Sequence, residues 1–332
     1  MIPSGSIDFA NNYEYMYLLT GATGFIGRHI AQEMLVRGAS VDMVVREKPR
    51  ELTTAYAGCG WHVVGNINSK TDWGSTLHGV QTVLHCAARA HVMREPMADA
   101  IAAYREVNVA GTMRLAHQAA VAGVKRFVFL SSIGVNGNQS ILPFTESSTP
   151  QPHDAYAVSK LEAEQALLAL AVQTGMEVVI IRPPLVYGPD APGNFGSLVR
   201  LVQRGLPLPL GAVHNQRSLV ALDNLVSLVV LCADRARSPQ AANQVFVVAD
   251  GEDVSTSTLL RKVARAAGRP SRLLPVPAGC LRAGASLLGK RAVADRLLGN
   301  LQVDATKART LLGWQPVVSM DEQLARMFEN KD

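Results

Sequence analysis

Residues 17–35 read YLLTGATGFIGRHIAQEML, and this stretch decides the fold. An apolar run, Met16–Leu19, leads into a turn that carries Gly21, Gly24 and Gly27, and an amphipathic run with apolar side chains at helical spacing follows. Strand, glycine turn and helix together predict a dinucleotide-binding unit, because the glycines allow a sharp turn, the approach of backbone N–H groups to a pyrophosphate, and close packing of helix on strand. The spacing is G-x-x-G-x-x-G rather than G-x-G-x-x-G.

The composition is that of a soluble globular protein. The chain has 332 residues, of which 48% are hydrophobic and 18% are charged, so it can bury a large core. The formal net charge is +5 and no long basic block occurs, which argues against a nucleic-acid partner. The four cysteines show no C-x-x-C and no metal-ligand spacing, so we expect no metal site and a cytoplasmic location. No membrane span is predicted, and residues 1–15 are expected to be a poorly ordered extension.

The first half of the chain alternates strands and helices. Apolar strands are predicted at 16–19, 41–45, 61–64, 82–86, 126–130 and 178–181, and long helices at 104–122 and 155–173. This order predicts an α/β fold with a doubly wound parallel sheet that is covered on both faces. Later segments are richer in proline and glycine, with a strand at 244–248 and short helices at 196–204, 224–233, 256–267, 280–288, 305–312 and 320–328. We expect a dinucleotide-binding domain at 16–182 and about 214–249, and a smaller C-terminal substrate lobe at about 183–213 and 250–330.

The pentapeptide YAVSK at 156–160 carries the candidate chemistry. Tyr156 and Lys160 are four residues apart, so they share one face of a helix. An ammonium group near a phenol lowers the pKa of the phenol, which predicts Tyr156 as a general acid or base near neutral pH. The pair Ser131-Ser132 follows the fifth strand and offers a hydroxyl for a substrate oxygen. A Y-x-x-x-K pattern alone is also typical of a solvated helix face, but its place after a glycine turn and a serine pair favours catalysis.

Six ordered motifs show which family the chain resembles. They are TGATGFIG at 20–27, HCAA at 85–88, VNVAGT at 107–112, LSSIGVNG at 130–137, YAVSK at 156–160 and RPPLVYGP at 182–189. On these motifs the chain resembles the extended short-chain dehydrogenase/reductase superfamily, specifically the NAD(P)-dependent nucleotide-sugar epimerases, dehydratases and 4-ketoreductases. The resemblance covers about residues 16–328 and includes the glycine spacing.

The resemblance implies a role for each motif. Tyr156 would be the catalytic acid/base, Lys160 would orient the cofactor ribose and lower the tyrosine pKa, and Ser132 would bind the reacting hydroxyl or ketone, with Ser131 as the fallback. Asn194 and Arg217 would bind the substrate diphosphate, while a second family arginine has only Arg291 or Arg296 as candidates. Besides Tyr156 and Lys160, the implied cofactor-binding residues are Gly21, Thr23, Gly24, Phe25, Ile26, Gly27, Arg46, Asn66, Ile67, Ala87, Ala88, Arg89, Asn108, Pro183 and Val186.

Departures from the family pattern bear on the cofactor and the reaction. NAD-using members carry an acidic residue at the end of the second strand, where this chain has Val45 followed by Arg46. Because an arginine can pair with a 2′-phosphate, we expect NADP in preference to NAD, the alternative being that Arg46 is a solvated charge. Asn66 replaces an aspartate near the adenine. Dehydratases carry an acidic pair after the catalytic Ser/Thr, and Ile133-Gly134 stands there instead, which argues against dehydration.

The motifs leave more than one function open. The first expectation is reduction at C4 of a UDP-4-keto-6-deoxy-hexosamine in surface-polysaccharide synthesis, with consumed NADPH. The alternative is a UDP-hexose 4-epimerase of the UDP-glucose or UDP-GlcNAc type with tightly bound NAD, and both reactions use the same residues. A non-catalytic dinucleotide-binding sensor is more distant, because such proteins usually lose the tyrosine or the lysine. The partners expected are a UDP-sugar and a second copy of the chain, since the family commonly dimerises through the helix of Tyr156 and the helix before it.

Overall fold

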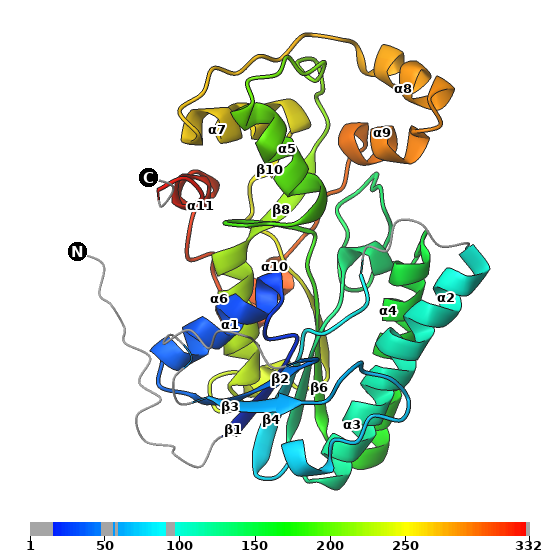
Figure 1. The fold of residues 1–332 in the computed structure, drawn as a ribbon, viewed down its shortest axis with the longest axis vertical. Coiled ribbons are helices and arrows are strands. Elements are labelled where there is room, and N and C mark those ends of the chain that lie inside the picture. Colours follow the sequence, from blue (N-terminus) through cyan, green and yellow to red (C-terminus); the bar gives the residue numbers. More distant parts are fainter. Residues whose placement is uncertain (1–15, 48–55, 57–58, 91–96, 330–332) are drawn as a thin grey trace. The chain divides into compact units, whose positions relative to one another are not determined.

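The computed structural model describes residues 16–47, 56, 59–90 and 97–329 (Figure 1). The chain divides into two compact units, and each is assembled from three segments. Unit 1 comprises Met1–Ser131, Asp154–Ile181 and Leu228–Val245, and unit 2 comprises Ser132–His153, Arg182–Ser227 and Phe246–Asp332. The extension predicted at residues 1–15 lies outside the described residues.

A seven-stranded sheet with the order β3-β2-β1-β4-β5-β6-β9 confirms the predicted doubly wound fold. Its strands are β1 (Met16–Thr20), β2 (Ser40–Val45), β3 (Gly60–Val63), β4 (Val80–His85), β5 (Arg126–Leu130), β6 (Glu177–Arg182) and β9 (Gln244–Val247). Neighbouring strands from β3 to β6 pair in parallel. The strand order reverses between β1 and β4, and ligands of such sheets bind at the carboxyl ends of the strands at this point.

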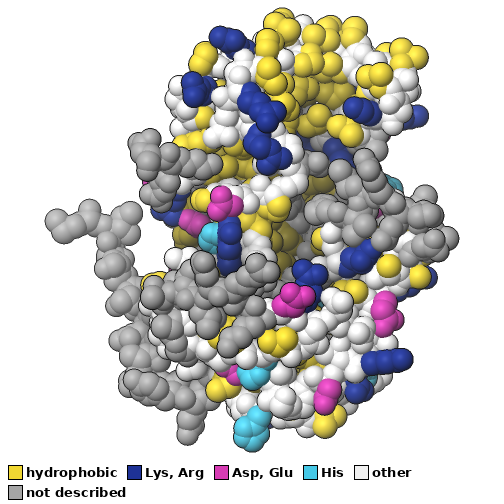
Figure 2. All heavy atoms as spheres, in the orientation of Figure 1, with side chains coloured by type: hydrophobic (Ala, Val, Ile, Leu, Met, Phe, Trp, Pro, Cys, Tyr) yellow, Lys and Arg dark blue, Asp and Glu magenta, His cyan; other side chains and the backbone are white. Residues whose placement is uncertain are grey.

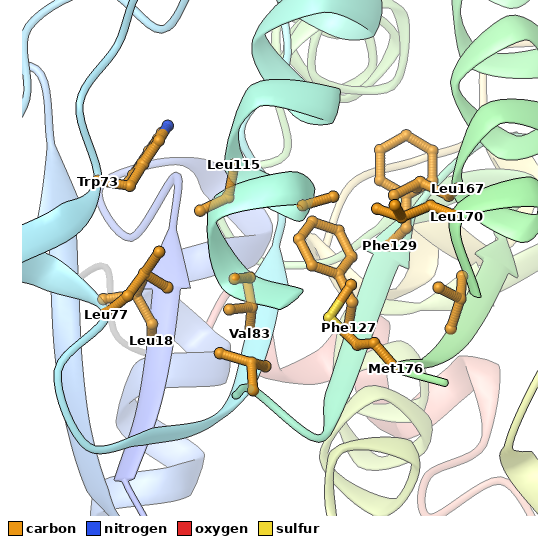
Figure 3. Close-up of a cluster of buried hydrophobic side chains, with 14 of the residues drawn as sticks. Leu18, Trp73, Leu77, Val83, Leu115, Phe127, Phe129, Leu167, Leu170 and Met176 are labelled. Atoms are coloured by element: carbon orange, nitrogen blue, oxygen red, sulfur yellow. The ribbon is translucent and has the colours of Figure 1, made fainter. Parts of the chain in front are cut away.

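The core of unit 1 packs helices against β5 (Figure 3). Phe127 and Phe129 of β5 lie in one buried cluster with Leu115 of α3 (Thr112–Val121) and Leu167 of α4 (Ala155–Thr174). Burial of each such side chain contributes about 1.5–3 kcal/mol. Helix α2 (Met97–Arg105) packs against α4, as α3 does, so these helices lie side by side in unit 1 (Figure 1).

The prediction of one continuous helix at 104–122 is wrong in detail. The structure has α2, then a π-helical segment η3 (Glu106–Gly111), and then α3. A π-turn inserts a residue into the helix without ending it, so the apolar periodicity does not reveal it. Gly111 closes the π-segment, and a Cβ there would lie 2.7 Å from Cγ2 of Ile67. The remaining regular segments of unit 1 are α1 (Phe25–Val36), η2 (Gly74–Thr76) and η5 (Pro239–Ala241), and α6 (Leu222–Ala233) contains the boundary between the units.

Unit 2 contains the predicted small C-terminal elements and several that the sequence analysis missed. A mixed sheet has the order β10-β8-β7, with β7 (Leu185–Tyr187) parallel and β10 (Asp253–Val254) antiparallel to β8 (Arg217–Ala221). Strands β7 and β10, with three and two residues, are too short to show alternation of apolar and polar residues. The helices are η4 (Ile133–Val135), α5 (Gly193–Gln203), α7 (Thr256–Ala266), α8 (Ala278–Leu287), α9 (Arg291–Leu298), α10 (Thr306–Leu312) and α11 (Met320–Arg326), of which η4 and α9 were not predicted.

The compact units differ from the expected domains in two segments. Residues 132–153 and 214–227, which were expected in the dinucleotide-binding domain, group with unit 2. The first of these has polar links of its own: Asn136 donates through Nδ2 to the carbonyl oxygen of Thr145 at 3.2 Å and accepts from Arg182 at 3.1 Å. Hydrogen bonds of this kind leave no periodic signal in a sequence. Within the described ranges, every helix is too short or too polar to cross a bilayer.

Candidate active site

The glycine turn after β1 has a shape that only glycine allows. Gly21 has φ = +72°, and a Cβ there would lie 2.8 Å from the backbone nitrogen of Ala87. A Cβ on Gly27 would lie 2.1 Å from the carbonyl oxygen of Gly21. Helix α1 begins at Phe25 with no acidic residue in its first turn, so its free N–H groups and positive dipole end are directed at the turn. This cradle fits the pyrophosphate of a dinucleotide.

His85, the last residue of β4, ties together the strand ends beside the turn. Its Nδ1 lies 2.7 Å from Oγ1 of Thr20 and its Nε2 lies 2.9 Å from Oγ1 of Thr112. Oγ1 of Thr20 also accepts the backbone N–H of Ala87 at 3.3 Å. Burial, and secondly the charge of Lys160, lowers the pKa of His85 to about 3. The neutral ring therefore holds β1, β4 and α3 together, and with them the segment that follows β4.

Asn108 lies in the π-segment η3, and its side chain fixes the segment that follows β4 to α4. Its Nδ2 donates to the carbonyl oxygen of Arg89 at 3.1 Å and to Oγ of Ser159 at 3.0 Å, and its Oδ1 accepts the N–H of Arg89 at 2.8 Å. Ser159 in turn donates to the carbonyl oxygen of Tyr156 at 2.7 Å. The buried amide thus positions the backbone after β4 relative to the helix turn that carries Tyr156.

Helix α4 places Tyr156 and Lys160 on one face, as the spacing predicts. The helix begins after Asp154, whose carboxylate accepts the backbone N–H of Ala157 at 2.8 Å and so caps the first turn. Lys160 is buried, and its Nζ donates to the carbonyl oxygen of Leu130 at 2.7 Å. This carbonyl ends β5, so the ammonium group lies at the carboxyl edge of the sheet.

Aromatic rings surround the two side chains. The Lys160 Nζ lies 4.2 Å from the ring centre of Phe129 and 6.0 Å from that of Tyr156. The ring of Tyr104 meets that of Tyr156 edge to face, with centroids 6.1 Å apart, and the guanidinium carbon of Arg89 lies 5.8 Å from the Tyr104 ring centre. The pair therefore sits in a largely apolar wall of unit 1, where charges interact strongly.

The pKa of Tyr156 is shifted in the direction opposite to the expectation. Burial raises the pKa of Tyr156, and the charge of Asp154 raises it further. Burial also lowers the pKa of Lys160 to about 8, although Cys86 and Glu164 favour its charged form. The expected lowering of the phenol pKa is wrong for this arrangement, because the Lys160 Nζ is bonded to a carbonyl rather than to the phenol. Proton abstraction by Tyr156 near neutral pH requires a positive charge closer to its oxygen.

The chain passes from unit 1 to unit 2 between Ser131 and Ser132. Oγ of Ser132 accepts the backbone N–H of Gly134 at 3.1 Å and caps η4, so its own proton remains available for a substrate oxygen. Oγ of Ser131 is buried without a hydrogen-bond partner among the residues that the structure describes. The carbonyl oxygen of Pro183 accepts the N–H of Ile133 at 2.9 Å, and Val186 lies half-buried in β7.

Arg217 at the start of β8 is oriented by the end of α9. One guanidinium nitrogen, Nη1, donates to the carbonyl oxygens of Arg296 at 2.8 Å and Gly299 at 3.1 Å. Burial lowers the pKa of Arg217, and the partial negative charge of a helix end offsets that cost. The guanidinium fork has further N–H groups for phosphate oxygens. The other expected diphosphate contact, Asn194, lies in the first turn of α5, but its side chain is outside what the structure describes.

The residues expected around the adenosine lie at the ends of β2 and β3. Val45 is buried and Arg46, directly after it, is exposed. Asn66 is also exposed, and its backbone oxygen accepts Nδ2 of Asn68 at 3.0 Å. Ile67 packs against the core of unit 1. Arg46 therefore stands at the position expected to distinguish a 2′-hydroxyl from a 2′-phosphate.

Sequence reasoning missed three contributors to the site. Asp154 caps α4 and raises the pKa of Tyr156, and an aspartate directly before a helical pattern is a signal that could have revealed it. Thr20 meets His85 because each ends a strand and β1 pairs with β4 in parallel. Tyr104 could not be found from the sequence, because its contact with Tyr156 depends on how α2 packs against α4.

The fold and the site define a dinucleotide-dependent enzyme of the short-chain dehydrogenase/reductase type. A family model described as the NAD dependent epimerase/dehydratase family matches residues 17–249. The chain belongs to this family, which confirms the resemblance in its motifs, and it is an NAD(P)-dependent enzyme of the nucleotide-sugar epimerase/dehydratase class.

Three individual proteins illustrate the similarity. A UDP-glucose 4-epimerase of Vibrio cholerae is 46% identical over 317 residues, which cover 94% of each chain. A UDP-glucose 4-epimerase of Mycolicibacterium smegmatis is 30% identical, over 94% of this chain and 97% of the relative. The crystal structure of a UDP-glucose 4-epimerase with UDP-glucose from Thermotoga maritima superposes with a TM-score of 0.73 at 23% identity, over 95% of this chain and 97% of that one. This last similarity concerns the fold alone.

Proposed function

We propose that this protein is a UDP-hexose 4-epimerase of the UDP-glucose type that works with bound NAD. The observation that carries the proposal is the 46% identity to the Vibrio cholerae UDP-glucose 4-epimerase, which extends over 94% of both chains. The Val45-Arg46 pair favoured a 4-ketoreductase, and this relative supports the alternative instead. Both reactions use the same residues, Tyr156, Lys160 and Ser132. The epimerase and the reductase differ in whether the hydride that reaches the 4-ketone was first taken from the same sugar or comes from added NADPH.

The chemistry divides between the cofactor and the chain. The glycine turn, with Gly21, Gly24 and Gly27, would hold NAD, which when bound would supply the hydride acceptor and donor that exchange at C4 of the sugar requires. Tyr156 removes the proton of the 4-hydroxyl as the C4–H bond breaks, and gives a proton back when the ketone is reduced. Ser132 donates its hydroxyl proton to the same oxygen. Lys160, whose pKa burial lowers to about 8, would orient the cofactor ribose through its ammonium group, as the resemblance implies.

Arg217, oriented by the end of α9, would hold the UDP diphosphate. The guanidinium is already oriented by the carbonyl oxygens of Arg296 and Gly299. An oriented arginine loses less side-chain entropy when it binds phosphate oxygens. The homodimer expected from the resemblance stays a prediction, and the helices expected to form it, α3 and α4, expose Val121 and Val172.

A UDP-sugar 4-ketoreductase that consumes NADPH remains the second candidate. The specific observation for it is the exposed Arg46 after the buried Val45, since an arginine there pairs with a 2′-phosphate. The two candidates differ in whether the cofactor is regenerated in each turnover. An epimerase needs no added nucleotide, whereas a reductase consumes one NADPH for each sugar.

The test is turnover of UDP-glucose and UDP-galactose by the purified protein without added cofactor, with mass spectrometry of the nucleotide that co-purifies. We expect interconversion of the two sugars and bound NAD. Tyr156→Phe should lower kcat by about 10²–10⁴-fold. Tyr56→Phe is the matched control, because among the described residues the Tyr56 hydroxyl makes only a 3.5 Å contact to the Arg28 carbonyl oxygen. Strict dependence on added NADPH, with no interconversion, contradicts the epimerase and favours the reductase.

A further inference from the structure

Helix α8 has the composition of a buried helix but lies on the surface of unit 2. Its sequence, AGCLRAGASL, contains one charged residue, Arg282. A helix that is apolar around most of its circumference is normally buried. In α8 every described residue is at least partly exposed, and the side chains of Leu287 and of Leu288 directly after it are 90% and 73% exposed.

Neighbouring segments extend this apolar surface. Helix α9 packs against α8 and leaves Val293 52% exposed, and Leu274, before α8, is 51% exposed. We call Leu274, Leu287, Leu288 and Val293 the apolar patch. Figure 2 shows hydrophobic side chains gathered on the part of unit 2 that carries these helices in Figure 1, with Lys and Arg side chains at their edges. Contiguous apolar surface of this kind marks an interaction site more often than scattered single residues do.

Basic residues dominate the sequence around the apolar patch, and the first acidic residue after α8 is Asp295 of α9. From Val254 to Ala294 the sequence contains eight Lys and Arg residues and no Asp or Glu. Lys262 is already paired with Glu252 and Asp321. Five exposed basic residues lie between the end of α7 and the first residue of α9, and we call them the basic rim: Arg269, Arg272, Arg282, Lys290 and Arg291.

We propose that α8 docks on an anionic lipid surface, with the apolar patch at the level of the acyl chains and the basic rim against lipid phosphates. Ten helical residues span about 15 Å, which is half of a hydrocarbon core, so α8 would lie in the interface and not cross it. Helices that bind at a membrane interface combine leucines with Lys and Arg side chains, and each basic residue adds attraction to anionic lipid.

Charge complementarity favours lipid over a second copy of the chain. A two-fold contact between two α8 surfaces would place the basic rim opposite its own copy. Like charges so arranged repel one another, whereas anionic headgroups neutralise them.

The test is co-sedimentation of the full chain with vesicles. One set contains phosphatidylcholine alone and the other contains phosphatidylcholine with phosphatidylglycerol. We expect binding to the anionic vesicles at low salt, little binding to the neutral ones, and weaker binding at high salt because salt screens the basic rim. Wild-type protein that stays in the supernatant with anionic vesicles overturns the proposal.

Two double variants separate the apolar and the charged contributions. Leu287→Ser with Leu288→Ser should lower partitioning by at least about tenfold, since two leucine side chains no longer enter the lipid. Arg282→Gln with Lys290→Gln should lower it by about tenfold on anionic vesicles alone. The matched control is Ile141→Ser with Leu142→Ser, because these adjacent residues of unit 2 are 98% and 77% exposed and lie outside the apolar patch.

The readouts distinguish docking from misfolding and from self-association. All variants should keep the wild-type circular dichroism spectrum and turnover of a soluble sugar nucleotide, since α8 is not in the candidate catalytic machinery. Equal loss of binding in the control pair overturns the proposal. A change in sedimentation-velocity mass for the leucine pair, without vesicle binding by the wild type, assigns the patch to a second copy instead.

Discussion

At the scale of single residues, His85 is a side chain that its surroundings hold in the neutral form. Its ring is buried between Thr20 and Thr112, and its pKa falls from 6.5 to about 3. The folded protein therefore binds fewer protons at this site than the unfolded chain does. The stability that His85 contributes is complete above pH 6.5 and decreases as the pH falls toward 3.

This linkage predicts a pH dependence that one substitution removes. Between about pH 7 and about pH 4.5 the wild type should lose about 2–3 kcal/mol more unfolding free energy than His85→Gln does. Urea unfolding of both proteins at the two pH values measures the difference. The exposed His78 gives the control, because His78→Gln should follow the wild type. Equal slopes for wild type and His85→Gln would mean that His85 is not held neutral.

The catalytic pair shows how far a sequence predicts a residue's environment. The four-residue spacing of Tyr156 and Lys160 was enough to place both on one face of a helix. It did not reveal where the ammonium group points, because the carbonyl oxygen of Leu130 that holds it comes from β5. It also did not reveal that burial, with Asp154, raises the pKa of the phenol. Such effects depend on which elements surround a side chain, and spacing along one element contains no information on them.

At the scale of elements, the start of α4 joins a structural role to an electrostatic one. Asp154 caps the helix by accepting the N–H of Ala157, and its charge raises the pKa of Tyr156. The two roles can be separated, because asparagine caps a helix as well as aspartate does but carries no charge. Asp154→Asn removes the charge and keeps the cap, while Asp154→Ala removes both.

We therefore expect different results from the two substitutions. Asp154→Ala should cost about 1 kcal/mol of unfolding free energy, and Asp154→Asn should cost little. Both should move the Tyr156-dependent limb of the pH–rate profile to lower pH, by about half a unit or less since Asp154 is exposed and screened. Chemical denaturation and pH–rate profiles of the three proteins measure the two effects. An unchanged profile for Asp154→Asn would show that the carboxylate does not act on Tyr156.

Elements also show which features a pattern can predict. The strand, glycine turn and helix from Met16 onward were predicted because the glycines have steric tasks that no other residue performs. At Gly27, for example, a Cβ would lie 2.1 Å from the carbonyl oxygen of Gly21. The π-segment η3 was not predicted, because one inserted residue shifts the helical phase without adding a breaker. Its consequence is functional, since it presents Asn108 to Arg89 and Ser159.

At the scale of the whole molecule, the two units are interleaved along the chain. The sequence predicted that a segment at about 214–249 returns to the dinucleotide-binding domain, and in the structure the part of it that groups with unit 1 is 228–245. The reason is visible at Arg126 of β5, which is fully buried. Its guanidinium donates to Glu177 at 2.8 Å, to the carbonyl oxygen of Cys232 at 2.8 Å and to Oγ of Ser238 at 3.0 Å.

This arrangement predicts that the dinucleotide-binding part does not fold when the chain is cut after Ile181, where the second of its three segments ends. A chain ending at Ile181 retains Glu177 but loses Cys232 and Ser238, so a buried charge loses most of its partners at a cost of about 3–5 kcal/mol. That cost is comparable to the whole stability of a typical domain, about 5–15 kcal/mol. The shortened chain should show no cooperative thermal transition by circular dichroism, whereas the full chain should show one. In the full chain, Ser238→Ala removes a single partner and should cost only about 1–3 kcal/mol. A shortened chain that unfolds cooperatively near the full-length Tm would show that the last segment is dispensable, and that Glu177 alone suffices for Arg126.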